Sequence, residues 1–116
     1  MKEYFNDDEF RCSCCGGYVL SVELRQMLNK AREIAGIPFV ITSGYRCEKH
    51  NEYIGGVANS SHTKGVAVDI SANDSRRRGL ILKGLYLAGF TRVGISESFI
   101  HADIDNDKKN NVAWLY

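Results

Sequence analysis

Residues 60–69 of this chain read Ser-Ser-His-Thr-Lys-Gly-Val-Ala-Val-Asp. From the glycine onward small and apolar residues alternate, and a period of two residues is typical of a β-strand. The buried face of that strand would carry the apolar members Val66, Val68 and Ile70. The stretch therefore predicts a loop that carries His62, followed by a strand that presents Asp69 on its opposite face.

His62 and Asp69 stand seven residues apart, and a second cluster at residues 99–103, FIHAD, adds His101. Two imidazoles and one carboxylate make three ligands, the count of a catalytic zinc site, which leaves its fourth position to water. A spacing of seven from histidine to aspartate also arises by chance. A surface histidine, or one held by an ordinary hydrogen bond, is therefore the alternative interpretation.

The sequence around this stretch predicts both helices and strands. Apolar residues at helical spacing indicate one helix over 22–35, capped by Ser21, and another from Asn73 or Asp74 to about position 88. The apolar members of this second helix would be Leu80, Ile81, Leu85 and Leu87. A short polar helix is expected at 47–54, and strands are expected at 39–42, 65–71, 93–95 and 99–104. The tail at 112–116 would pack back as a last strand or cap, which gives an α+β domain with helices on a small, mainly antiparallel sheet.

The composition is that of an ordinary globular protein. The chain has 116 residues, 44% of them hydrophobic, and a net charge of +1, so we expect one domain and neither a nucleic-acid nor a membrane partner. The basic run at 76–78 is interpreted as a solvated helix face, with a patch for an anionic polymer as the alternative. The acidic start lacks an apolar signal region, so we expect synthesis in the cytoplasm without a signal peptide. We also expect a monomer.

Four cysteines form a further group, three of them within residues 12–15, a segment that reads CSCC. Cys12, Cys14, Cys15 and Cys47 are interpreted as buried free thiols, as a disulfide pair, or as a second metal site. Read as C-x-C-C, the run differs from the C-x-x-C pair of common zinc modules. The sequence leaves these three alternatives open.

Residues 60–69 match the pattern S-x-H-x-x-G-x-A-x-D at every specified position, and this pattern resembles the signature of the zinc D-Ala-D-Ala peptidases, the M15 peptidase family. Residues 43–46, SGYR, match a second family segment, and Asn51 with residues 55–56 resembles its N-x-x-x-G-G loop. Residues 99–103 are similar to the F-x-H-x-D strand of the small phage-type branch. The N-terminal segment 1–17 resembles the start of that branch, so the similarity covers nearly the whole chain.

The resemblance implies a single domain of the hedgehog/DD-peptidase fold type, with Zn²⁺ as cofactor and His62, Asp69 and His101 as its ligands. It places Arg46 at the mouth of the site, where its guanidinium would clamp a substrate carboxylate or stabilise an oxyanion. The alternative for Arg46 is a salt bridge that ties the turn to the next helix. Ser60 would contact substrate, or would only shape the loop as a cap.

The general base is the departure from the family pattern. Several members carry it three residues before the last histidine, where this chain has Ser98, which cannot act as a base. Asp103 shares a strand face with His101 and is our first candidate, although it would also suit orientation of that imidazole. Glu97 is a near-equal candidate, provided that the turn at 96–98 folds it back over the metal.

The resemblance implies a peptidase that hydrolyses the stem peptides of bacterial peptidoglycan, as a D-Ala-D-Ala carboxypeptidase or an endolysin-type endopeptidase. It would act at the cell wall after release during phage or prophage lysis, or as part of a virion. A non-catalytic zinc-containing module that binds cell wall or another protein is the alternative, and a redox sensor built on the cysteines is a weaker one. His50 has no ligand partner at metal spacing and is interpreted as a surface residue, with a substrate role as the alternative.

Overall fold

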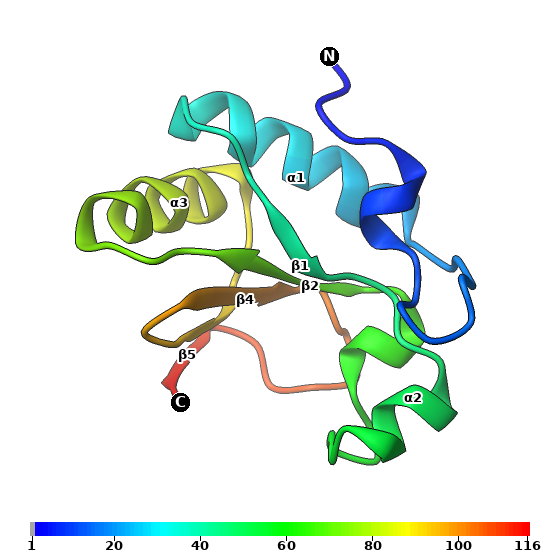
Figure 1. Cartoon of the computed structure of the whole chain (residues 1–116). Helices are drawn as coiled ribbons and strands as arrows, with labels where there is room; N and C mark the ends of the chain where they lie inside the picture. The colour runs from blue at the N-terminus through cyan, green and yellow to red at the C-terminus, as the bar shows by residue number, and fades with distance from the viewer. Residues whose placement is uncertain (1) are drawn as a thin grey trace.

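The computed structural model describes residues 2–116 of the chain. A five-stranded sheet in the order β1-β2-β4-β3-β5 forms its centre (Figure 1). The strands are β1 (Ile41–Ser43), β2 (Ala67–Ser71), β3 (Arg92–Ile95), β4 (Phe99–Asp103) and β5 (Val112–Leu115). Two long helices, α1 (Val22–Ala35) and α3 (Ser75–Ala88), cover one face, while the short helix α2 (Glu48–Tyr53) lies at one end of the sheet on the other side. The predicted α+β class is confirmed.

Local capping signals set the ends of the two long helices. The Ser21 side chain accepts a hydrogen bond from the backbone N–H of Leu24, and the Asp74 side chain accepts one from that of Arg77. Gly36 and Gly89 end the helices in the left-handed conformation, which glycine adopts without steric cost. The predicted bounds of α1 are therefore confirmed, and those of α3 are within two residues.

The sheet is antiparallel except at one edge. β2 pairs with both β1 and β4, and β3 pairs with β4, all antiparallel, but β5 lies parallel to β3. The tail is thus a strand, one of the two predicted outcomes. β1 begins later than predicted, because Phe39 is buried in the core before regular pairing starts and the register shifts between Ile41 and Ser43.

The core fills the space between the sheet and the two long helices. Its fully buried members from these elements include Leu24, Leu28, Val68, Ile70, Ile81, Leu85 and Ile100. The alternation predicted for residues 65–71 holds from Ala67, where β2 begins, since Val68 and Ile70 enter this core and Asp69 lies on the opposite face. Val66 precedes the strand and is only half-buried, so its predicted place in the core is wrong. The prediction for Leu87 is wrong: its side chain is 59% exposed, because the face of α3 that packs on α1 is formed by Ile81, Gly84, Leu85 and Ala88.

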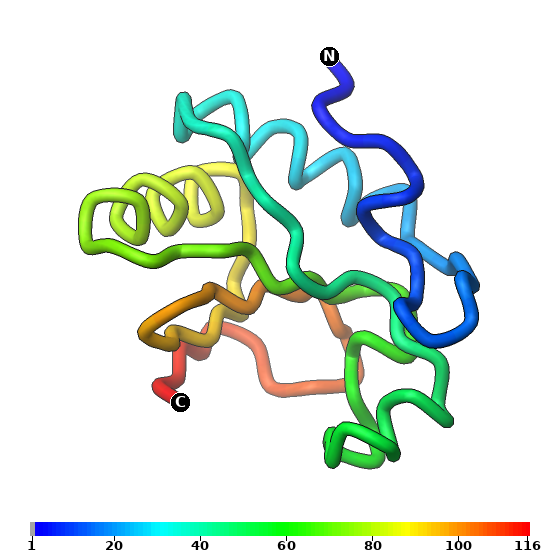
Figure 2. The backbone as a smooth tube through the Cα atoms, viewed as in Figure 1, coloured from blue at the N-terminus to red at the C-terminus, as the bar shows by residue number. Residues whose placement is uncertain are grey.

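The N-terminal segment packs beside the residues that lead from β1 to α2 (Figure 2). It contains a 3₁₀ turn, η1 (Asp7–Phe10), and the Phe10 side chain is fully buried. The backbone N–H of Tyr45 donates to the carbonyl of Phe10 at 2.8 Å. A Cβ atom on Gly44 would lie 2.6 Å from the Phe10 Cα, so this close approach requires glycine. None of the helices within residues 2–116 has the length and apolar character needed to cross a membrane.

Candidate metal centre

Three side chains meet on the sheet face opposite the long helices. Asp69 on β2 and His101 on β4 are directly paired across the two strands, so both project from the same face. His62 comes from a 3₁₀ turn, η2 (Ser61–Lys64), which leads into β2. The Ser60 side chain caps this turn by accepting a hydrogen bond from the backbone N–H of His62 at 3.2 Å. We call His62, Asp69 and His101 the candidate metal centre.

The three residues offer ligand atoms to one point. Nε2 of His62 lies 3.3 Å from Oδ1 of Asp69, and Nδ1 of His101 lies 3.0 Å from the same oxygen. One ligand atom from each residue lies within 4.8 Å of the others. Both imidazoles are buried, and their ring centroids are 5.2 Å apart. The structure thus brings the three predicted ligands together.

The outer nitrogen of each imidazole has its own partner. Nδ1 of His62 lies 2.8 Å from the carbonyl oxygen of Gly44, which can only accept, so this nitrogen carries a proton and Nε2 is the nitrogen directed at Asp69. Nε2 of His101 lies 2.7 Å from Oδ2 of Asp103. Metal-binding histidines almost always donate their second N–H to a carbonyl or carboxylate in this way. The donor set and its orientation therefore fit a metal ion.

The electrostatics of the centre favour a positive charge between these groups. Burial opposes ionisation of Asp69, but hydrogen bonds from His101 and His62 outweigh it and hold the pKa of Asp69 well below its usual range. Burial also disfavours protonated His101, yet the hydrogen bonds to Asp103 and Asp69 raise its pKa above the ordinary value. The centre thus combines an ionised carboxylate with a region that attracts a proton or a cation.

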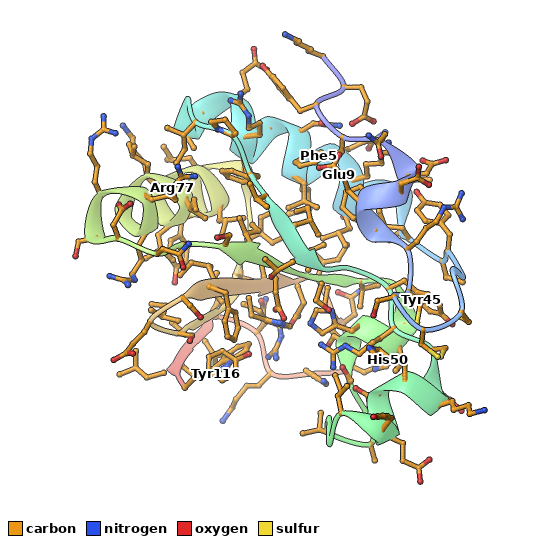
Figure 3. All side chains as sticks on the ribbon, viewed as in Figure 1. Phe5, Glu9, Tyr45, His50, Arg77 and Tyr116 are labelled. Atoms are coloured by element: carbon orange, nitrogen blue, oxygen red, sulfur yellow. The ribbon has the colours of Figure 1, made fainter. Side chains whose placement is uncertain are left out.

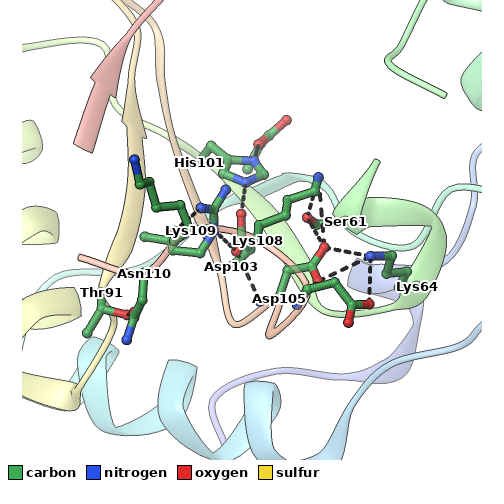
Figure 4. A network of polar contacts seen from close by, with 12 residues as sticks. Ser61, Lys64, Thr91, His101, Asp103, Asp105, Lys108, Lys109 and Asn110 are labelled. Atoms are coloured by element: carbon green, nitrogen blue, oxygen red, sulfur yellow. Dashed lines mark hydrogen bonds and ion pairs between the residues drawn. The ribbon is translucent and has the colours of Figure 1, made fainter. Parts of the chain in front are cut away.

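Asp103 is 1% exposed, and both of its oxygens are in use (Figure 4). Oδ2 contacts His101, while Oδ1 accepts from Nε of Arg92 at 2.7 Å and from the backbone N–H of Asp105 at 3.1 Å. Burial raises the pKa of Asp103, but these hydrogen bonds lower it by a larger amount, so the net shift is downward. Asp103 is therefore an ionised group that orients the His101 ring through Nε2, the nitrogen that does not face Asp69.

Asp105 fixes the turn that carries His62 (Figure 4). Its Oδ2 accepts a hydrogen bond from the Ser61 hydroxyl at 2.7 Å and from Nζ of Lys64 at 3.0 Å. Nζ of Lys108 donates to the same Ser61 hydroxyl at 3.0 Å. Because Ser61 and Lys64 are the two ends of η2, this buried carboxylate sets the position of the whole turn.

Replacing Asp105 should lower the free energy of unfolding at neutral pH and make it less dependent on pH between 4 and 2. Burial opposes ionisation of Asp105, but the Ser61 hydrogen bond and the Lys64 contact lower its pKa from an ordinary 3.8 to about 2. A lowered pKa in the folded state stabilises the fold above pH 4, and this contribution is lost as the pH falls from 4 to 2. We expect Asp105→Asn to lower the free energy of unfolding at neutral pH by about 2 kcal/mol.

Denaturant unfolding at neutral pH and near pH 3 measures this effect. Asp107→Asn is the matched control, because Asp107 contacts the same Lys64 at 3.2 Å but its side chain is 77% exposed. The control should differ little from the unaltered chain at either pH. An Asp105→Asn chain that is as stable at neutral pH as the unaltered one would contradict the prediction.

The candidate metal centre opens into a cavity of about 430 Å³. Its lining includes Arg46 and Ser60, together with Arg92, Lys108, Phe99, Trp114 and Tyr116. The ring centroid of Trp114 lies 5.4 Å from that of His101. Figure 3 shows Tyr116 on the side of the sheet away from α1 and α3. We call Phe99, Trp114 and Tyr116 the aromatic wall of the cavity, and the candidate metal centre lies beside it.

Arg46 lies between the candidate metal centre and α2. Its Nη1 donates to Oδ1 of Asn51 at 2.9 Å, and its Nη2 lies 4.0 Å from Oδ2 of Asp69. Its Nε is buried and has no hydrogen-bond partner within residues 2–116. Gly56 allows this arrangement, because a Cβ there would lie 2.1 Å from Oδ1 of Asn51. Arg46 thus ties the turn to α2 and also presents charge to the cavity.

Glu97 and His50 do not join this site. The Glu97 side chain is exposed in the connection between β3 and β4, and it does not line the cavity. The connection is short, with the Ser96 N–H donating to the carbonyl of Phe99 at 3.0 Å, and it does not fold back over the centre. His50 lies on α2 with Nε2 3.2 Å from the Ser13 hydroxyl, close to Tyr45 in Figure 3. The role of Glu97 as a base stays a prediction.

Sequence reasoning missed Arg92 and the aromatic wall. Arg92 is the residue paired with Asp103 in the β3–β4 register, but the predicted strand began one residue after it. Trp114 and Tyr116 reach the cavity because the tail pairs with β3. The run of apolar residues in the tail was the only signal for them, and it does not say which strand the tail joins.

A protein-family model described as Peptidase M15 matches residues 3–103. The chain belongs to the peptidase M15 family. The match includes all three residues of the candidate metal centre, as well as Arg46 and Asp103. Family membership supports a peptidase. No curated protein matches the chain significantly.

Proposed function

We propose that this M15 peptidase is zinc-dependent and hydrolyses peptide bonds in the stem peptides of bacterial peptidoglycan. The observation that carries the proposal is the convergence of two oriented imidazoles and one ionised carboxylate at the floor of a cavity. Two histidines and one carboxylate are a common ligand set of catalytic zinc, with the fourth position left to water. Zinc in such a site polarises a carbonyl and lowers the pKa of bound water.

The residues of the chain would hold the substrate beside this centre. Arg46 lines the cavity with a charged guanidinium, which suits a carboxylate or the oxygen of a scissile carbonyl. Phe99, Trp114 and Tyr116 give one side of the cavity an aromatic surface. Stem peptides that end in D-alanine offer both a carbonyl and a carboxylate, and the M15 resemblance directs us to them. Because one chain supplies every group, we propose that the protein acts as a monomer. Because the proposed substrate is peptidoglycan, we propose that it acts at the cell wall.

A second candidate is a non-catalytic zinc module that binds the cell wall. One observation favours it: among the described residues 2–116, the cavity-lining carboxylates are Asp69 and Asp103 alone. The first belongs to the candidate metal centre, and both oxygens of the second are engaged. No lining carboxylate is therefore free to accept a proton without a rearrangement.

Incubation with defined muropeptides decides between the two. The zinc-loaded protein should release stem-peptide products that mass spectrometry identifies, and chelation of the metal should abolish their release. The masses also identify the bond that is cleaved. Intact muropeptides at every pH from mildly acidic to alkaline, with one ion bound at the candidate metal centre, would favour the binding module instead.

A further inference from the structure

Four thiols gather outside the candidate metal centre, where the N-terminal segment meets the start of α2. The sulfur atoms of Cys12, Cys14 and Cys47 all lie within 4.8 Å of one another. Cys15, the residue after Cys14, lies outside this group of three. All of them are free thiols. We call these four residues the cysteine cluster.

The backbone directs hydrogen-bond donors at these sulfurs. The N–H of His50 donates to Sγ of Cys47 at 3.3 Å, and the N–H of Gly17 donates to Sγ of Cys15 at 3.3 Å. The N–H of Cys47 donates to Sγ of Cys12 at 3.5 Å. Hydrogen bonds to sulfur favour the thiolate, which is the form that binds metals. Backbone donors from both segments are thus directed at sulfur atoms.

The loop at 12–17 is closed by two backbone hydrogen bonds. The N–H of Cys12 donates to the carbonyl of Gly17, and the N–H of Gly16 donates back to the carbonyl of Cys12, both at 2.8 Å. Gly16 has a φ of 70°, which favours glycine. Cys12 and Cys15 are themselves a C-x-x-C pair, which the interpretation of the run as C-x-C-C overlooked. That spacing is the one common in zinc modules.

We propose that one structural Zn²⁺ ion binds the thiols of the cysteine cluster, Cys12, Cys14, Cys15 and Cys47. Four thiolates around one ion are a typical structural zinc site, closed to substrate. At a Zn–S distance of about 2.3 Å, tetrahedral sulfurs lie about 3.8 Å apart. The sulfurs of Cys12, Cys14 and Cys47, which lie within 4.8 Å of one another, therefore need little movement, and the Cys15 side chain moves to complete the site. Each ligating thiol loses its proton to solvent as its Zn–S bond forms, and nothing is oxidised or reduced.

Such an ion would hold the N-terminal segment against the wall of the cavity. Cys47 directly follows Arg46, whose backbone N–H donates to the carbonyl of His62 at 3.2 Å. Gly44, whose carbonyl holds the His62 ring, lies against Phe10 of the N-terminal segment. The cysteine cluster therefore acts at a distance, by fixing the segment that presents Arg46 and supports His62.

The test counts metal ions in a chain whose candidate metal centre has been removed. His62→Ala/His101→Ala, purified under reducing conditions, should still hold one zinc ion per chain by elemental mass spectrometry. Adding Cys12→Ser and Cys47→Ser should abolish this ion. Ser13→Ala is the matched control, because it changes an exposed hydroxyl in the same loop and should leave the ion bound.

Cobalt provides a readout that depends on no variant. Co²⁺ added to the unaltered metal-free chain should produce the near-ultraviolet charge-transfer bands of sulfur ligation, which the candidate metal centre cannot produce. Absence of these bands, or an ion retained without the cysteines, would overturn the proposal. A purified chain that holds no metal and whose mass shows disulfides would also overturn it. Iron bound to the cysteine cluster in place of zinc would overturn it as well. None of these measurements uses a substrate, so a failure of the proposed peptidase function leaves them interpretable.

Discussion

Replacing His62 or His101 by alanine should remove one metal ion per chain and abolish hydrolysis with it. Each imidazole directs one nitrogen at Oδ1 of Asp69, so either change leaves two of the three ligands. Changes to the outer partners of metal ligands already cost about 10–100-fold in metal affinity, and the loss of a ligand should cost more. Zinc content by elemental mass spectrometry and product release from muropeptides, measured on the same samples, check this.

His50→Ala is the matched control for these two variants. His50 is the remaining histidine, and its side chain contacts Ser13 rather than the candidate metal centre. We expect that variant to keep both the ion of the candidate metal centre and hydrolysis. Circular dichroism should show that every variant is folded, since His101→Ala also leaves Asp103 buried without one partner. An unchanged metal content in both His62→Ala and His101→Ala would refute the ligand assignment.

The parts of the fold that the sequence predicts well are those that depend on neighbouring residues. Ser21, Gly36 and Asp74 cap their helices through contacts within four residues, so the helix bounds follow from local chemistry. The alternation in β2 is equally local. The parallel pairing of β5 with β3 is different, because no residue in the tail specifies which edge of the sheet it joins.

The same distinction applies to the site. The three predicted ligands could be found from residue type, order and family resemblance, and cross-strand pairing of Asp69 with His101 then brings them together. Arg92 could not be found in this way. Its contact with Asp103 depends on the β3–β4 register, and strand spacing along β4 alone carries no information on that register. The same missing information left the role of Asp103 open between base and orienting group.

Asp103→Asn should weaken zinc binding by about 10–100-fold while most turnover returns at saturating zinc. The geometry supports this expectation, because Asp103 reaches the centre only through the outer nitrogen of His101. Its other oxygen is held by Arg92 and by the Asp105 N–H, and the side chain is 1% exposed. An amide retains the shape of the carboxylate but removes the charge that holds the His101 proton.

A general base would give the opposite pattern. Loss of a positioned base typically costs about 10²–10⁴-fold in kcat and leaves the metal bound, so excess zinc would not restore turnover. Zinc titration followed by kcat at saturation, each across a pH series, separates the two roles. A chain that keeps its zinc affinity but stays inactive would make Asp103 the base, as our first interpretation of the sequence had it.

Glu97→Gln completes the comparison, because Glu97 is the other candidate for the base. Its side chain is exposed and outside the cavity lining, so we expect zinc affinity and kcat to change little. A large loss of kcat with zinc still bound would mean that the turn at 96–98 closes over the substrate and delivers this carboxylate. Little change in kcat for both variants at saturating zinc would exclude both predicted bases. The proton acceptor would then have to be sought among the groups that directly line the cavity, of which Asp69 is the remaining carboxylate within the described residues 2–116.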